Sequence, residues 1–166
     1  MRDFISRDHF LSLLHRERAA WDGLISGLDP AQMSQPGVCN EWSVKDTIAH
    51  IIFFEKEIIG MLKARALAGS DLWDLPADER NAVIFQQNRH LSMEKILADS
   101  AQTYHDLHVQ LESLPSEAMT DPKCFPGMPA DWQPWKIIAE NTFEHYTHHA
   151  ADIRSWLRKR GPGKHE

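Results

Sequence analysis

Cysteine is scarce in this sequence, and long apolar runs are missing. The 166 residues include only two cysteines, Cys39 and Cys124, which lie far apart and form no CxxC pair. This pattern offers no disulfide framework and favours a reducing compartment. The longest apolar stretch, IAHIIFF, is far too short to span a bilayer, and the first ten residues lack the apolar core of a signal peptide. We therefore expect a cytoplasmic protein with no membrane partner.

Positive charge is also in short supply. Lysine and arginine number 18 against 24 aspartates and glutamates, which gives a net charge of −6, and no basic run stands out. Because a nucleic-acid surface requires a basic patch, we expect no nucleic-acid partner. Strand-like alternation and internal repeats are missing as well. Histidine, in contrast, is plentiful, with ten in the chain.

Helical periodicity covers most of the chain. Four long segments and one shorter segment carry apolar residues at spacings of three and four, bounded by serine, proline and glycine. Helices over these segments, joined by long loops, predict an all-α four-helix bundle. Residues 1–160 would form a single domain, and residues 161–166 a loose C-terminal tail. The expected helices cover residues 7–26, 43–67, 76–85, 92–114 and 134–160.

Two histidines on the last predicted helix point to metal chemistry. His145 and His149 are four residues apart, so a helix places both imidazoles on one face, where they can hold one ion. The rest of this face is apolar. The pair alone does not decide between a metal site and buried rings that bond to polar partners.

A third histidine lies close to the start of the second long helix. Ser43 and Asp46 have the spacing of a capping-box variant, and a carboxylate is also favoured in the first helical turn. His50 follows Asp46 by four residues. Taken alone, His50 is best explained as a helix histidine that bonds to Asp46.

Both histidine segments resemble motifs of one family. The stretch PGVCNEWSVKDTIAH, residues 36–50, resembles the second-helix motif of the DinB/YfiT-like metalloenzyme superfamily, and residues 145–149 resemble its terminal HxxHH motif. The order and separation of the motifs match the family, and the resemblance spans nearly the whole chain. It is near the mycothiol-dependent maleylpyruvate isomerase N-terminal domains and the ClbS/DfsB group. The matching positions are Pro36, Gly37, Trp42, Ser43, Asp46, His50, His145, His148 and His149.

The resemblance implies a fold, a ligand set and partners. The fold is a four-helix bundle with up-down-down-up order, and the three metal ligands map to His50, His145 and His149. A homodimer is implied, as is a low-molecular-weight thiol co-substrate such as mycothiol, bacillithiol or glutathione. Many members have glutamine three residues after the last ligand, where this chain has Asp152. This departure from the family pattern affects what the resemblance implies about substrate binding more than what it implies about metal binding.

Three imidazoles on two facing helices would have a definite chemistry. They suit a divalent zinc, nickel or iron ion, and also copper, and three protein ligands leave open the positions that catalysis uses. With no protein anion beside it, the ion would favour hydroxide or thiolate and make a nucleophile near neutral pH. Asp46 and Asp152 are the carboxylates placed to orient ligand rings. For Asp152, a salt bridge with Arg154 or Lys159 is an equal alternative.

Four neighbouring residues receive structural roles. We expect His148 at the rim or surface, Glu57 in solvent, and Trp42 as a cap on the bundle. Cys39 is expected to be a small buried residue rather than a nucleophile.

These observations predict a metal-dependent enzyme, a thiol-dependent transferase or hydrolase that acts on a small electrophilic molecule. The alternative is a metal-free bundle that binds or sequesters a small molecule, as in self-protection. A structural bundle with satisfied core histidines is a third interpretation. The substrate pocket is expected at one end of the bundle, rimmed by the loops after Gly27 and after Pro115.

Overall fold

The protein is all-α. The computed structural model describes residues 5–161, and within that range the only β pairing is an isolated bridge between Cys39 and Trp42. Residues 162–166 of the predicted tail lie outside the described residues. Over the described range, each helix is too short or too polar to cross a membrane.

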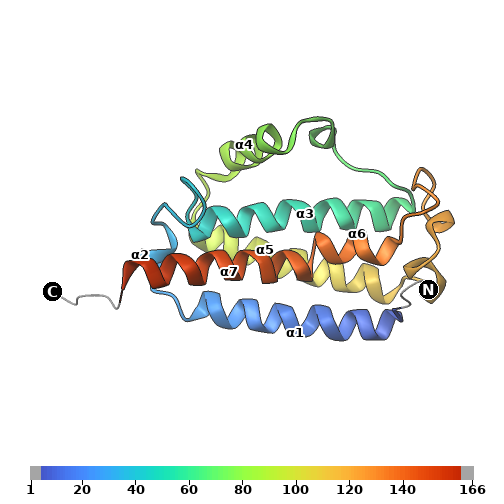
Figure 1. Ribbon diagram of the computed structural model, residues 1–166, viewed down its shortest axis with the longest axis horizontal. Helices are drawn as coiled ribbons and strands as arrows, with labels where there is room; N and C mark the ends of the chain where they lie inside the picture. Colours follow the sequence, from blue (N-terminus) through green and yellow to red (C-terminus); the bar gives the residue numbers. More distant parts are fainter. Residues whose placement is uncertain (1–4, 162–166) are drawn as a thin grey trace.

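Four long helices form the bundle. They are α1 (Arg7–Ser26), α3 (Val44–Ala64), α5 (Met93–Glu112) and α7 (Phe143–Arg160). Helices α1 and α7 run in one direction, and α3 and α5 run in the other (Figure 1). The predicted up-down-down-up bundle is therefore confirmed, and α3 packs against both α5 and α7.

Shorter elements fill the connections. The loop after α1 and the loop after α5 lie at opposite ends of the bundle (Figure 1). The elements are α2 (Pro30–Met33), η1 (Asp71–Asp74), α4 (Ala77–Asn88), η2 (Ser116–Met119), η3 (Pro122–Cys124) and α6 (Pro134–Glu140).

Serine caps fix where three of the long helices begin. The hydroxyls of Ser6, Ser43 and Ser92 each accept a hydrogen bond from the backbone N–H three residues later, at 3.1–3.2 Å. Asp46 accepts in return from the backbone N–H of Ser43 at 2.8 Å, which completes the predicted capping box. Such caps are typically worth about 1 kcal/mol each. The cap at Ser43 also fixes the position of His50, which lies in the second turn of α3.

The prediction of one continuous helix over residues 134–160 is wrong in its middle. The structure has two helices, α6 and α7, separated by Asn141 and Thr142. The amide of Asn141 donates to the carbonyl of Ile137 at 2.8 Å, and the hydroxyl of Thr142 donates to the carbonyl of Ile138 at 2.7 Å. Side chains of this kind compete with backbone N–H groups for helix carbonyls. The interruption lies just before the turn of α7 that carries the first histidine.

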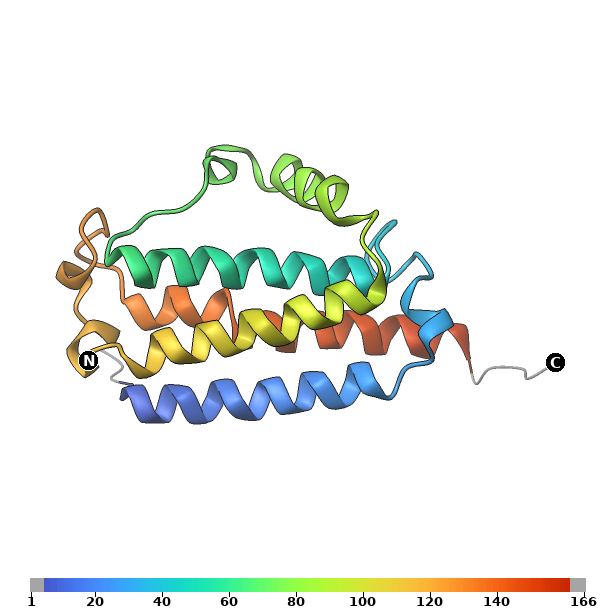
Figure 2. The same ribbon diagram turned by 180° about the vertical axis from the view of Figure 1, so that it is seen from behind.

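Residues 65–92, which we call the crossover arm, connect the parallel helices α3 and α5. The arm carries η1 and α4 along the outer side of α3 (Figure 2). Glu57 on α3 accepts from the backbone N–H of Ser70 at 2.7 Å and from the indole N–H of Trp73 at 2.6 Å. The ammonium of Lys45 donates to two carbonyls just after α4. Glu57, which was expected to be solvated, thus attaches the arm to the bundle.

Candidate metal centre

Three histidines converge between α3 and α7. His50 lies on α3, and His145 and His149 lie on α7. The Nε2 atoms of His50 and His145 are 3.1 Å apart, and one ring nitrogen from each histidine lies within 4.8 Å of the other two. Two of the rings are buried and the third, His145, is half-buried. The structure therefore brings together all three residues of the predicted ligand set.

The geometry of this cluster suits a divalent ion. Zinc binds imidazole nitrogen at about 2.0–2.1 Å in a tetrahedral arrangement, which puts ligand nitrogens about 3.3 Å apart. The 3.1 Å between the Nε2 atoms of His50 and His145 is close to that spacing. Three imidazole nitrogens are also a donor set that zinc, nickel, copper and iron accept. The residues present fit such an ion.

The ring of His149 is oriented by a carboxylate. Its Nδ1 lies 3.1 Å from Oδ2 of Asp152, so this nitrogen carries the proton and donates it, which leaves Nε2 free to bind an ion. The Nδ1 atoms of His50 and His145 are buried and have no hydrogen-bond partner among residues 5–161. Buried polar atoms normally find partners. These two nitrogens are therefore exceptions, and an ion bound at the Nε2 atoms would not change this.

Burial keeps the three imidazoles neutral. It lowers the pKa of His50 to about 3, with smaller contributions from the charges of His149 and Arg80. Burial likewise lowers the pKa of His145 to about 2, helped by the neighbouring histidines. The pKa of His149 is also lowered by burial, and the carboxylate of Asp152 partly offsets this. Because neutral imidazole is the form that binds metal, these side chains need lose no proton at neutral pH.

Other predicted site residues have different outcomes. The carboxylate of Asp46 accepts from the backbone N–H and the hydroxyl of Ser43, at 2.8 and 2.6 Å, and makes no hydrogen bond to His50 in the described structure. The helix cap thus occupies the carboxylate that was expected to orient His50. His148 is exposed, as predicted, with 74% of its side chain accessible. Cys39 is exposed rather than buried.

Aromatic side chains surround the cluster. The rings of Trp42 and Phe54 lie 4.9 and 4.7 Å from the ring of His50. Two rings of the crossover arm pack behind them, with Trp73 5.7 Å from Phe54 and Phe85 6.4 Å from Trp42. The crossover arm and the loop before α3 therefore enclose the histidines, and Trp42 contacts the site directly.

The expected rim of the pocket is partly wrong. The loops after Gly27 and after Pro115 lie at opposite ends of the bundle, so they cannot border one pocket (Figure 1). Only the first loop reaches the histidines, through Trp42. The crossover arm, rather than the loop after Pro115, forms the other side of the site. Hydrogen bonds from the arm to Glu57 hold it against α3.

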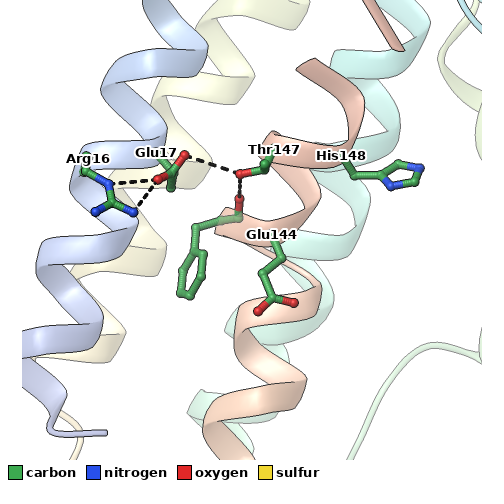
Figure 3. Close-up of a pocket in the computed structure, with 6 residues that line it drawn as sticks. Arg16, Glu17, Glu144, Thr147 and His148 are labelled. Carbon is green, nitrogen blue, oxygen red and sulfur yellow. Dashed lines mark hydrogen bonds and ion pairs between the residues drawn. The ribbon is translucent and has the colours of Figure 1, made fainter. Parts of the chain in front are cut away.

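A separate surface pocket of about 420 Å³ lies between α1 and α7 (Figure 3). Two of its charged groups pair with each other, Arg16 with Glu17 at 2.7 Å, and the hydroxyl of Thr147 donates to Glu17 at 3.3 Å. The three-histidine cluster does not line it. The lining residues are Arg16, Glu17, Phe143, Glu144, Thr147 and His148.

Sequence reasoning missed a buried polar cluster next to the histidines. The hydroxyl of Tyr146 donates to the carboxyl group of Glu55. The guanidinium of Arg18 donates to the same hydroxyl at 3.4 Å and to the hydroxyl of Ser100 at 3.1 Å. Tyr146 directly follows His145, so this cluster helps to fix the turn of α7 that carries a candidate ligand.

Replacing Gly69 by alanine should disturb the wall of the site. A Cβ atom there would overlap Cδ1 of Trp73 and lie 2.8 Å from Oε2 of Glu57, so the indole must move. We expect the free energy of unfolding to fall by about 1–3 kcal/mol, measured by chemical denaturation. Gly60→Ala is the matched control, because nothing lies within 4 Å of its Cβ position. Since alanine is the better helix former, that control should gain about 0.5–1 kcal/mol; equal effects in the two variants would contradict the packing of Trp73.

The sequence matches a known protein family over most of its length. The family described as "Mycothiol maleylpyruvate isomerase N-terminal domain" matches residues 14–154. Among curated proteins, no match to this chain was found.

Solved structures share the fold at low sequence identity. A protein from Streptococcus pneumoniae superimposes with a TM-score of 0.81 at 14% identity, covering 95% of this chain and 93% of that one. The sibling lethal factor precursor DfsB has the same TM-score and identity, covering 97% and 100% of the two chains. The colibactin self-resistance protein ClbS, in complex with double-stranded DNA, has a TM-score of 0.74 at 11% identity, covering 90% and 94%. At these identities the likeness shows the fold alone.

Proposed function

The chain belongs to the family of the mycothiol maleylpyruvate isomerase N-terminal domain, and on this premise we propose that it is a metal-dependent enzyme. The reaction is the transfer of a low-molecular-weight thiol, or of water, to a small electrophilic molecule. The proposal rests on the convergence of three neutral imidazoles from two helices. One ring nitrogen of each imidazole lies within 4.8 Å of the other two. The ligands are His50, His145 and His149, and the ion is zinc, nickel or iron.

The residues around the three histidines would orient a ligand ring and exclude water from the centre. When bound, a divalent ion lowers the pKa of a coordinated thiol or water, so that a nucleophile exists near neutral pH. Asp152 holds the proton of His149 on Nδ1 and keeps its Nε2 directed at the centre. Trp42 and Phe54 pack against His50 and exclude water from that side. Low polarity around the rings strengthens every electrostatic interaction at the centre.

A metal-free binding protein is the second candidate. The Nε2 atoms of His50 and His145 are close enough to hydrogen-bond one another when one of them carries a proton, so part of the cluster is satisfied without an ion. The fold shared with the self-resistance protein ClbS agrees with a protective role that sequesters a reactive small molecule. The ClbS structure contains double-stranded DNA, but the net charge of −6 disfavours such a partner here.

Thiol consumption by metal-loaded protein tests the proposal. The protein is loaded in turn with zinc, nickel or iron and offered bacillithiol, mycothiol or glutathione together with model electrophiles. At least one metal form should consume thiol or hydrolyse an electrophile, and His50→Ala should reduce the rate to background. If every metal form stays at the His50→Ala background, the metal-free binding function is the better account.

We further propose that the protein acts in the cytoplasm as a homodimer of single-domain subunits. Family resemblance supports the homodimer, and the low cysteine content supports a reducing compartment such as the cytoplasm. Light scattering at the mass of a monomer would exclude the dimer.

A further inference from the structure

The crossover arm places one arginine beside the histidine cluster without a polar partner. The Cζ atom of Arg80, on α4, lies 4.6 Å from the ring centroid of Trp73 and 5.8 Å from that of Phe54. Its guanidinium makes no ion pair or hydrogen bond within residues 5–161, and its Nε is buried with no partner. Stacking on two rings covers the faces of a guanidinium but leaves its N–H edge free.

An unpartnered buried donor of this kind needs an explanation. Leaving one unsatisfied is unfavourable, and a shift of the side chain into water would relieve the problem. Arg80 instead stays stacked on Trp73 and Phe54. A carboxylate is the natural partner, because its two oxygens match the parallel N–H groups of a guanidinium edge. An external anion would supply the hydrogen bonds that the chain does not.

The position of Arg80 connects it to the metal centre. Phe54, on which Arg80 stacks, has its ring 4.7 Å from the ring of His50 and 5.0 Å from that of His145. The positive charge of Arg80 also contributes to the lowered pKa of His50, so its field reaches the candidate ligand. Arg80 and two of the candidate ligands thus pack around the same ring, that of Phe54.

We infer that Arg80 binds the carboxylate of a small molecule whose reacting group lies at the three-histidine centre. This inference rests on the proposed function and narrows its substrate class to carboxylate-bearing molecules. The carboxylate belongs either to the thiol or to the electrophile.

The first experiment compares two thiols on cobalt-substituted protein. The probes are 3-mercaptopropionate and its uncharged analogue 3-mercaptopropanol, and the readout is the thiolate-to-cobalt absorption band. Wild-type protein should bind the carboxylate thiol about 10- to 100-fold more tightly, as expected for charge-assisted hydrogen bonds. Arg80→Gln should remove this preference, and Arg80→Lys should restore part of it. Arg89→Gln is the matched control, because Arg89, directly after α4, also stacks on a ring, that of Phe85, but is exposed.

A second experiment needs no metal and separates the two sources of the carboxylate. Propionate is titrated into metal-free protein while the indole N–H resonance of Trp73 is followed. Propionate should shift this resonance in wild type and in Arg89→Gln but not in Arg80→Gln. If propionate also binds cobalt-substituted protein that is saturated with 3-mercaptopropanol, the carboxylate belongs to the electrophile; if only the carboxylate thiol gains affinity, it belongs to the thiol.

The two experiments distinguish failure of the metal-dependent function from failure of the carboxylate-binding role of Arg80. A protein that binds no cobalt but shows the Arg80-dependent propionate shift retains the anion site and loses the metal-dependent function. A protein that binds both thiols equally in wild type and Arg80→Gln, with no propionate shift, keeps its metal site and overturns the role of Arg80.

Discussion

Replacing His149 by alanine should remove the divalent ion from the purified protein. Two of the three imidazoles would remain, and the nitrogen that Asp152 orients would be lost. Loss of an outer partner of a ligand typically costs about 10- to 100-fold in metal affinity. We therefore expect the loss of the ligand itself to cost at least about 100-fold. The measurement is the metal content after dialysis, followed by a competition titration with a chromophoric chelator.

His148→Ala is the control for this experiment. His148 is adjacent in sequence but exposed, and its nearest carboxylate oxygen, on Asp152, is 3.9 Å away. This variant should keep close to one ion per chain. An unchanged affinity in His149→Ala, or an equal loss in both variants, would mean that the ligand set is wrong.

Glu55→Gln should change how stability depends on pH. Burial raises the pKa of Glu55 to about 7, although Tyr146 and Arg18 partly oppose the shift. Between the unfolded pKa of 4.5 and the folded value, the native state holds a proton that the unfolded chain has released. The free energy of unfolding therefore falls as pH rises through this window. Glutamine can still accept the hydrogen bond of Tyr146 and carries no charge at any pH.

The expected result is a stability difference that grows with pH. The free energy of unfolding of Glu55→Gln, relative to that of the wild type, should rise by about 2–3 kcal/mol between about pH 5 and about pH 8. Urea denaturation at the two pH values measures it, and protonation of the histidines contributes equally to both proteins. Glu41→Gln, at an exposed loop position, should show no such trend. A difference that is the same at both pH values would mean that Glu55 is ionised in the native protein throughout.

Much of the fold was predictable because its signals are local. The serine caps at Ser6, Ser43 and Ser92 each satisfy backbone N–H groups within one turn, so the residue type marks the helix start. The histidine pair on α7 was predictable for the same reason, since a spacing of four fixes one face. The interruption at Asn141 and Thr142 was not, because both residues are tolerated inside a helix when their side chains do not bond to carbonyls.

The environment of the site depends on contacts between distant segments. The sequence does give one overlooked sign, because Glu55 lies four residues from the buried Ile51 and Ile59 and so occupies an apolar stripe. Its partner Arg18 comes from α1, and no local rule joins the two residues. Arg80 likewise reaches Phe54 from the crossover arm, which Glu57 and Lys45 hold against α3. Spacing rules reach one or two turns along a helix and cannot predict such pairs.

Anomalous X-ray scattering from crystals of the protein, recorded across the zinc, nickel and iron edges, would locate an ion at the three histidines. We expect one strong peak per chain, at about 2.0–2.2 Å from a nitrogen of each of His50, His145 and His149. The edge at which the peak appears would identify the ion. A peak at other residues, or none in crystals grown with each metal, would contradict the claim that these three histidines form a metal centre.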